Sequence, residues 1–151
     1  MPYLFEFTYH NPTQIVFGPN SFSRLGSLVP ADARVLLLYG GGSIKGNGVY
    51  DKVIATLAGR EVVEFAGVEP NPTLETLSAA VDLAKRQKID FILGVGGGSV
   101  SDGAKYVACA ALYDGDGWDI VSGRHAPREA LPVGIVLTLP ATGSESNPAA
   151  V

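Results

Sequence analysis

The amino-acid sequence predicts an α/β domain built on a parallel sheet. Two features predict this class: short apolar segments of strand length alternate with segments of helical periodicity, and several of the apolar segments end in clusters of small residues. The chain has 151 residues, 46% of them apolar, which is the size and composition of one domain with its own core. We therefore expect residues 1–151 to form a single domain.

Five segments are expected to be strands because they are short, apolar and bounded by turn residues. The run RVLLLY at Arg34–Tyr39 is apolar without alternation, which is typical of a strand that helices cover on both faces. The expected strands are residues 14–17, 34–39, 61–65, 91–95 and 132–139.

Three segments between these strands show apolar residues at helical spacing. They are residues 48–58, 74–88 and 100–112. Asn71 and Thr73 are both candidates for the N-cap of the second helix. Residues 114–117 predict a turn that leaves Trp118 in an irregular stretch. Right-handed connections would bring the loops that follow the strands to one edge of the sheet.

The composition excludes several classes of function. Lysine and arginine number 11 against 15 acidic residues, so the net charge of −4 argues against a nucleic-acid partner or an anionic membrane surface. No apolar run approaches the ~20 residues of a membrane span, and no secretory leader is visible, so a cytoplasmic location is expected. Cys109 is the single cysteine, and His10 and His125 lie far apart in sequence. No disulfide and no metal site is therefore expected within these residues.

The segment GGGS at residues 96–99 joins an expected buried strand to the start of a helix. Unpaired N–H groups at a helix start bind phosphate, and glycines let a pyrophosphate approach them closely. Ser99 can donate to a phosphate oxygen, and Asp102 would face the same crevice. The alternative is that the glycines only form a tight turn. The spacing fits neither the G-x-G-x-x-G motif nor a P-loop, so we expect a Rossmann-like dinucleotide site without the usual motif.

A second glycine cluster, Gly40, Gly41, Gly42 and Ser43, ends the strand at residues 34–39. An acidic residue at such a position commonly binds the ribose 2′-OH of NAD(H). None is present here, and Lys45 follows shortly after. The loop therefore favours NADP(H), whose 2′-phosphate Ser43 and Lys45 could bind, over NAD(H). The alternative for Lys45 is a solvated loop lysine.

A third group of small polar residues, TLPATGSE at 138–145, follows the last expected strand. Thr138 and Thr142 offer hydroxyl groups to a phosphate, a ribose or a nicotinamide amide. Such turns are common, so this signal is weak without the other two loops.

Five ordered blocks of sequence carry a resemblance to a known family. They are residues 15–18 (IVFG), 40–45 (GGGSIK), 67–73 (GVEPNPT), 96–102 (GGGSVSD) and 138–147 (TLPATGSESN). The chain resembles the N-terminal part of the iron-containing (group III) alcohol dehydrogenases, particularly the branch of NADPH-dependent butanol dehydrogenases and aldehyde reductases. The resemblance spans nearly all of the 151 residues.

The resemblance implies a role for particular residues. Gly40 to Ser43 would bind the adenosine ribose and its phosphate, Asn71 would lie on the adenosine side, and Gly40 stands where NAD-dependent relatives place an aspartate. The full set of implied cofactor-binding residues is Gly40, Gly41, Gly42, Ser43, Asn71, Gly97, Gly98, Ser99, Asp102, Thr138 and Thr142. The family also implies a small alcohol or aldehyde substrate, and a homodimer is a candidate assembly, with residues 14–17 offering an edge strand.

The resemblance also implies a part that these residues do not contain. In the family, a C-terminal all-helical domain holds iron or zinc through one aspartate and three histidines, and the metal polarises the substrate oxygen. We therefore expect this chain to be a truncated dinucleotide-binding domain without hydride-transfer activity and without catalytic residues of its own. Two alternatives remain: a stand-alone nucleotide- or phosphate-binding module, and a domain of an enzyme like glycerol dehydrogenase or dehydroquinate synthase.

Overall fold

Four parallel strands form one sheet, in the order β2-β1-β3-β4. The computed structural model describes residue 6 and residues 8–150. The strands are β1 (Arg34–Tyr39), β2 (Glu61–Ala66), β3 (Phe91–Gly96) and β4 (Val133–Leu137). The predicted fold class is confirmed, and four of the five expected strands form within two residues of their expected bounds.

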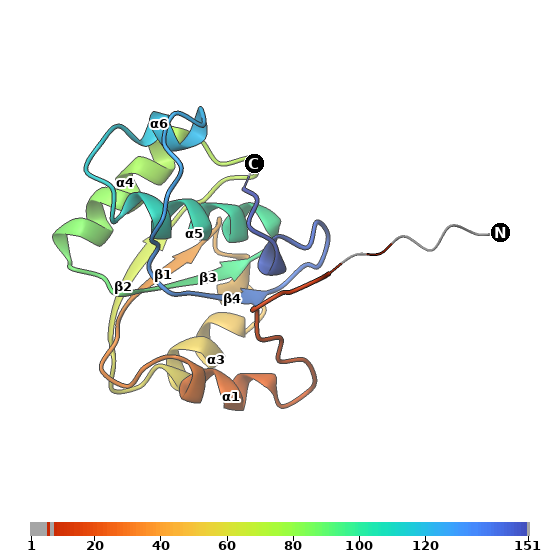
Figure 1. The fold of residues 1–151 in the computed structure, drawn as a ribbon. Coiled ribbons are helices and arrows are strands. Elements are labelled where there is room, and N and C mark those ends of the chain that lie inside the picture. Colours follow the sequence, from red (N-terminus) through yellow and green to blue (C-terminus); the bar gives the residue numbers. More distant parts are fainter. Residues whose placement is uncertain (1–5, 7, 151) are drawn as a thin grey trace.

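Helices cover both faces of this sheet, so the molecule has three layers (Figure 1). On one face lie α4 (Leu74–Arg86), α5 (Gly98–Ala110) and α6 (Gly117–Val121); on the other lie α1 (Ser21–Leu28) and α3 (Val49–Thr56). A short helix α2 (Ser43–Gly46) precedes α3, and a 3₁₀ turn η1 (Ser144–Ser146) follows β4.

The burial of β1 explains why its sequence does not alternate. Leu36 and Leu38 pack in the cluster that includes α4 and α5, whereas Val35 and Leu37 pack in the cluster on the α3 side. All four side chains are fully buried. Strand β1 thus has an apolar neighbour on each face, as a strand in a doubly covered parallel sheet requires.

A glycine allows α5 to lie close to β3. A Cβ atom at Gly94 would lie 2.9 Å from Cδ1 of Ile135 and 3.1 Å from Cβ of Ala104 on α5. Gly94 and Ala104 are therefore a pair of small residues at the contact between this helix and the sheet. This contact fixes where the N-terminus of α5 stands at the carboxyl edge of the sheet.

The expected strand at residues 14–17 is wrong. These residues have no regular structure, and the side chains of Ile15 and Phe17 are 71% and 99% exposed. A strand needs a ladder partner for its backbone N–H and C=O groups, and no described strand pairs with this segment. The segment instead leads into α1, a helix that the sequence pattern did not reveal.

The structure corrects the expectation for Trp118 and decides between the two candidate N-caps of α4. Trp118 does not lie in an irregular stretch, because it belongs to α6, where the side chain of Asp116 accepts from its N–H. Of the two candidate N-caps of α4, Thr73 is the cap, and its side chain accepts from the N–H of Thr76. The short helix α2 was not predicted.

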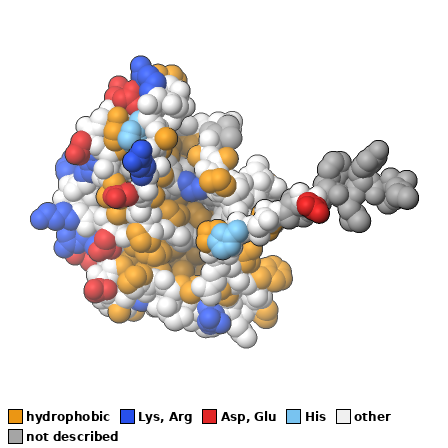
Figure 2. Space-filling view, viewed as in Figure 1, with side chains coloured by type: hydrophobic (Ala, Val, Ile, Leu, Met, Phe, Trp, Pro, Cys, Tyr) orange, Lys and Arg blue, Asp and Glu red, His pale blue; other side chains and the backbone are white. Residues whose placement is uncertain are grey.

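The outer edge of β4 carries apolar side chains. Figure 2 shows hydrophobic side chains gathered over this strand on the face viewed in Figure 1. Val133 is 37% exposed and Leu139, just after the strand, is 68% exposed. These exposed groups account for part of the positive mean hydropathy of +0.21.

Candidate functional site

All four strands run in the same direction, so the loops that follow them meet at one edge of the sheet. The chain passes from β1 outward to β2 and then crosses to β3 on the other side of β1. The order therefore reverses between β1 and β3, and open α/β sheets bind ligands at such a reversal. The segments that flank it are residues 40–43 and 96–99, the two glycine clusters of the sequence, which lead into α2 and α5.

The start of α5 has the form of a phosphate cradle. Gly97 is the N-cap in an extended conformation, and no side chain caps the helix. A Cβ at Gly98 would lie 3.1 Å from Oγ1 of Thr142, and one at Gly97 would lie 3.8 Å from Leu139. The structure thus brings Thr142, one of the sequence-predicted site residues, next to Gly98, where a side chain would be crowded against its hydroxyl.

Asn71 and Ser99 also meet at this edge. The backbone N–H of Asn71 donates to Oγ of Ser99 over 3.3 Å, although 28 residues separate them in the chain. Asn71 has φ of 54°, a left-handed conformation that asparagine tolerates better than most residues. The loop after β2 therefore joins the loop after β3.

Glu69 stabilises the loop that contains Asn71 by accepting hydrogen bonds. Its Oε1 accepts from the N–H of Thr73 over 2.9 Å and from the hydroxyl of Thr76 over 3.0 Å. These hydrogen bonds, the Thr73 N–H first among them, lower the pKa of Glu69 from 4.5 to about 2. The sequence analysis did not identify this residue as part of the site.

Replacing Glu69 with glutamine is expected to lower the melting temperature at neutral pH. Because the pKa of Glu69 is depressed in the folded state, its stabilising contribution is complete above pH 4.5 and is lost as the pH falls toward 2. The difference in melting temperature between the parent and Glu69→Gln should therefore shrink over that interval. Thermal unfolding at a series of pH values measures it, with Glu129→Gln in an exposed loop as the control. A difference that stays constant down to pH 3 would contradict the assignment.

Asp102 is held by groups from two elements. Oγ of Ser144 in η1 donates to Oδ1 of Asp102, and Nζ of Lys105 lies 3.5 Å from the same oxygen. Lys105 also donates to the carbonyl of Asn147 over 3.2 Å. The loop after β4 is thereby tied to the first turns of α5. Ser144 belonged to the predicted third loop. The role of Lys105 was not predicted, although its i, i+3 spacing from Asp102 on an expected helix is a signal of such a pair.

The first glycine loop is open to solvent. A Cβ at Gly41 or Gly42 would meet no atom within 4 Å, whereas one at Gly40 would lie 3.1 Å from the carbonyl oxygen of Val68. Gly42 has φ of 96°, which favours glycine. Ser43 is exposed, and so is Thr138, whose N–H donates to the carbonyl of Gly96 and extends the β3–β4 pairing.

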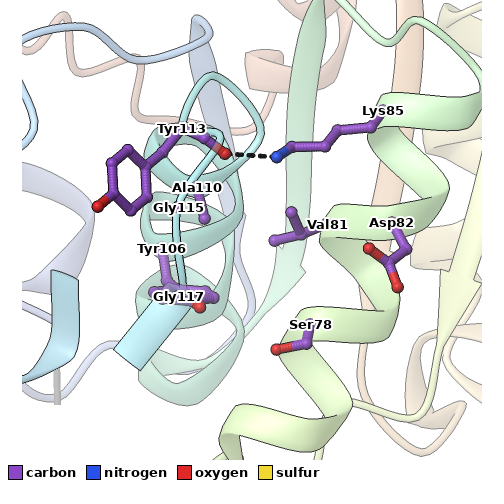
Figure 3. Close-up of a pocket in the computed structure, with 9 residues that line it drawn as sticks. All are labelled: Ser78, Val81, Asp82, Lys85, Tyr106, Ala110, Tyr113, Gly115 and Gly117. Carbon is purple, nitrogen blue, oxygen red and sulfur yellow. Dashed lines mark hydrogen bonds between the residues drawn. The ribbon is translucent and has the colours of Figure 1, made fainter. Parts of the chain in front are cut away.

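A small hollow lies elsewhere, between α4, α5 and the turn before α6 (Figure 3). Its volume is about 110 Å³, and Nζ of Lys85 reaches across it to the carbonyl of Tyr113. Sites for small molecules usually have ~300–1,000 Å³. None of the predicted site residues lines this hollow, so it is not the candidate site.

Within residue 6 and residues 8–150, no three His, Cys, Asp or Glu side chains gather in a way that could hold a metal ion. His125 instead stacks on Tyr113, with ring centroids 4.0 Å apart. No helix in this part of the chain has the length and apolar character needed to cross a bilayer.

Comparison with known proteins decides the family. Residues 12–151 match the family model of iron-containing alcohol dehydrogenases. The chain belongs to the iron-containing alcohol dehydrogenase family. The resemblance drawn from five blocks of sequence is confirmed, and the family is one of enzymes.

Several relatives in this family are close in sequence. The chain is 55% identical over 149 residues to the probable NADH-dependent butanol dehydrogenase 1 of Bacillus subtilis (strain 168), covering 97% of this chain and 38% of that protein. It is 53% identical to the NADPH-dependent aldehyde reductase YqhD of Escherichia coli (strain K12), with the same coverage. The chain thus spans 38% of the length of these two relatives.

Solved structures of the family share the fold. The crystal structure of YqhD from E. coli K-12 superposes with a TM-score of 0.89 at 52% identity, covering 94% of this chain and 37% of that one. The NADH-dependent butanol dehydrogenase A from Thermotoga maritima superposes with a TM-score of 0.90 at 51% identity, with the same coverage.

Proposed function

We propose that this chain is the cofactor-binding part of a metal-dependent oxidoreductase that transfers hydride between NADP(H) and a small alcohol or aldehyde. One observation carries the proposal: the two glycine loops flank the point where the strand order reverses, and Asn71 and Thr142 reach the second of them. The names of two close relatives, a butanol dehydrogenase and an aldehyde reductase, support this class of substrate.

The residues at the start of α5 fit the pyrophosphate of a dinucleotide. A glycine at position 98 leaves open the space that a side chain would fill against Thr142. The N–H groups of the first helical turn have no carbonyl partner within the helix, and their dipole favours an anion. We assign Gly97, Gly98 and Ser99 to the pyrophosphate, and Thr142 to the same side. When bound, the nicotinamide ring supplies the hydride chemistry.

The remaining residues divide between the two ends of the cofactor. Asp102, which Ser144 and Lys105 hold in place, belongs to the nicotinamide side together with Thr138. Gly40, Gly41, Gly42 and Ser43 belong to the adenosine ribose, with Asn71 on the same side. We propose a preference for NADP(H) because residues 40–43 carry no carboxylate that would repel a 2′-phosphate.

The metal of the family does not fit the residues of this chain. The described residues contain no group of His, Cys, Asp and Glu side chains that could hold it. We propose that the 151-residue chain alone transfers no hydride, and that the activity belongs to a longer polypeptide in which further residues bind the metal.

Titration of NADPH fluorescence tests the first part of this proposal. The full product of the native gene should bind NADPH, and it should reduce NADP⁺ in the presence of a short alcohol after loading with iron or zinc. The 151-residue chain should show no alcohol-dependent reduction of NADP⁺. Failure of the full product to bind either nicotinamide nucleotide would overturn the proposal. Nucleotide binding without any alcohol or aldehyde turnover would favour a binding module instead.

A further inference from the structure

A cluster of two tyrosines, a glutamate and a lysine adjoins the first glycine loop. Glu64 on β2 accepts two hydrogen bonds, one on each carboxylate oxygen: from the hydroxyl of Tyr39 over 2.7 Å and from the hydroxyl of Tyr50 over 2.5 Å. Tyr39 is the last residue of β1 and directly precedes Gly40. The carboxylate is therefore fixed in position next to the start of the loop.

Lys45 brings a positive charge to the same cluster from the other end of the loop. Its Nζ lies 3.8 Å from Oε2 of Glu64 and 4.6 Å from the ring centroid of Tyr50. Its backbone N–H donates to the carbonyl of Gly42 over 3.0 Å. The backbone bond ties Lys45 to the end of the loop, while Glu64 and the rings of Tyr39 and Tyr50 hold its ammonium group.

Both groups are charged at neutral pH. The hydrogen bond from Tyr50 lowers the pKa of Glu64, and the adjacent Tyr39 raises the pKa of Lys45. About half of the Lys45 side chain and about a third of the Glu64 side chain remain exposed, at 51% and 37%. A ligand charge at the loop would therefore act on both of them through partly solvated space.

We propose that Glu64 is a specificity-determining residue: by balancing the charge of Lys45, it limits how strongly this site prefers NADP(H) over NAD(H). The inference rests on the proposed function, which places the adenosine ribose at residues 40–43. A 2′-phosphate brings between one and two negative charges, which Lys45 attracts and Glu64 repels. Because NAD(H) lacks this phosphate, the two residues affect its binding far less.

A purely structural role for the cluster makes a different prediction. If Glu64 served only to pack α2 and α3 against the sheet, its loss would weaken the binding of both nucleotides by the same factor. An electrostatic role changes the ratio of the two dissociation constants, and it changes that ratio in opposite directions for Glu64 and Lys45. The ratio therefore separates the two roles even when a variant is less stable.

The test compares the dissociation constants of NADPH and NADH on the full product of the native gene. Glu64→Gln should raise the preference for NADPH about three- to tenfold, and Lys45→Met should lower it by a similar factor. Glu61→Gln is the matched control, because it removes the same charge from the other end of β2, where Glu61 pairs with Arg34. It should leave the ratio unchanged. The effect of Glu64→Gln should shrink between about 0.01 M and about 0.5 M salt.

Each outcome has a distinct meaning. Opposite shifts for Glu64→Gln and Lys45→Met, with no shift for Glu61→Gln, support the inference. If both nucleotides bind but Glu64→Gln leaves their ratio unchanged, the inference is overturned and the proposed function stands. Equal weakening of both nucleotides assigns the cluster a structural role and also overturns it. If the parent protein binds neither nucleotide, the proposed function fails, and the inference fails with it.

Discussion

Replacing Gly98 with aspartate is expected to weaken the binding of nicotinamide nucleotides by more than about a hundredfold. The first carbon of the new side chain would lie 3.1 Å from Oγ1 of Thr142, so it would occupy the open space above the start of α5. The carboxylate would then stand where we propose that the pyrophosphate binds, and it would replace a favourable interaction with repulsion. Titration of NADPH fluorescence measures the loss.

The fold should tolerate this change if the Thr142 hydroxyl shifts by a few tenths of an ångström away from the new Cβ. Gly98 is the first residue of α5 and does not have a positive φ, and an acidic residue near a helix N-terminus is favourable for the helix dipole. The control is Ala79→Asp, which adds the same charge on an exposed position of α4. We expect the control to bind NADPH like the parent. Normal binding by Gly98→Asp would show that the pyrophosphate lies elsewhere.

The sheet could be predicted from the sequence because its signals are local. Residues 35–39 and 91–95 have no charged or alternating polar residue, and each segment is followed by glycine, which is typical of a strand buried on both faces. The meeting of the two glycine clusters could also be predicted, because the carboxyl ends of parallel strands lie at one edge of the sheet. The placement of Gly98 beside Thr142 depends in addition on the pairing of β4 with β3, which was not predicted.

Features that depend on partners distant in the chain could not be predicted. Residues 14–17 have a suitable composition for a strand, but strand formation requires an adjacent strand, and composition does not specify one. The contact of Lys105 with Asn147 and that of Lys45 with Glu64 join residues far apart in the chain and depend on the rotamers of long side chains. The sequence analysis therefore identified Lys45 as a candidate for phosphate but could not identify the glutamate that balances its charge.

The names of the relatives show that the nicotinamide nucleotide differs between close members of the family. One close relative is named for NADH and another, nearly as similar to this chain, is named for NADPH. If the adenosine ribose binds at residues 40–43, as we propose, charged groups around this loop help to set the choice between the two nucleotides. Glu64 and Lys45 are the charged side chains that the structure holds beside it.

Replacing Gly94 with valine should cost about 3 kcal/mol of stability or more, at the upper end of the cost of overpacking a core. A Cβ at this position would lie 2.9 Å from Cδ1 of Ile135 and 3.1 Å from Cβ of Ala104. The Ile135 side chain can rotate away, but the Ala104 Cβ moves only if α5 moves. Valine adds two further methyl groups against the same helix, so Gly94→Ala should cost less than Gly94→Val.

Urea denaturation measures this cost, and Gly46→Ala is the control because a Cβ there would meet no atom within 4 Å. The control should stay within about 0.5 kcal/mol of the parent. A displaced α5 also moves Gly97 and Ser99, so Gly94→Val should weaken NADPH binding under conditions in which the variant is still folded. If Gly94→Val kept the parent's stability within about 1 kcal/mol, α5 could move away from β3 at little cost. The close contact between Gly94 and Ala104 would then not be what positions the phosphate cradle at the edge of the sheet.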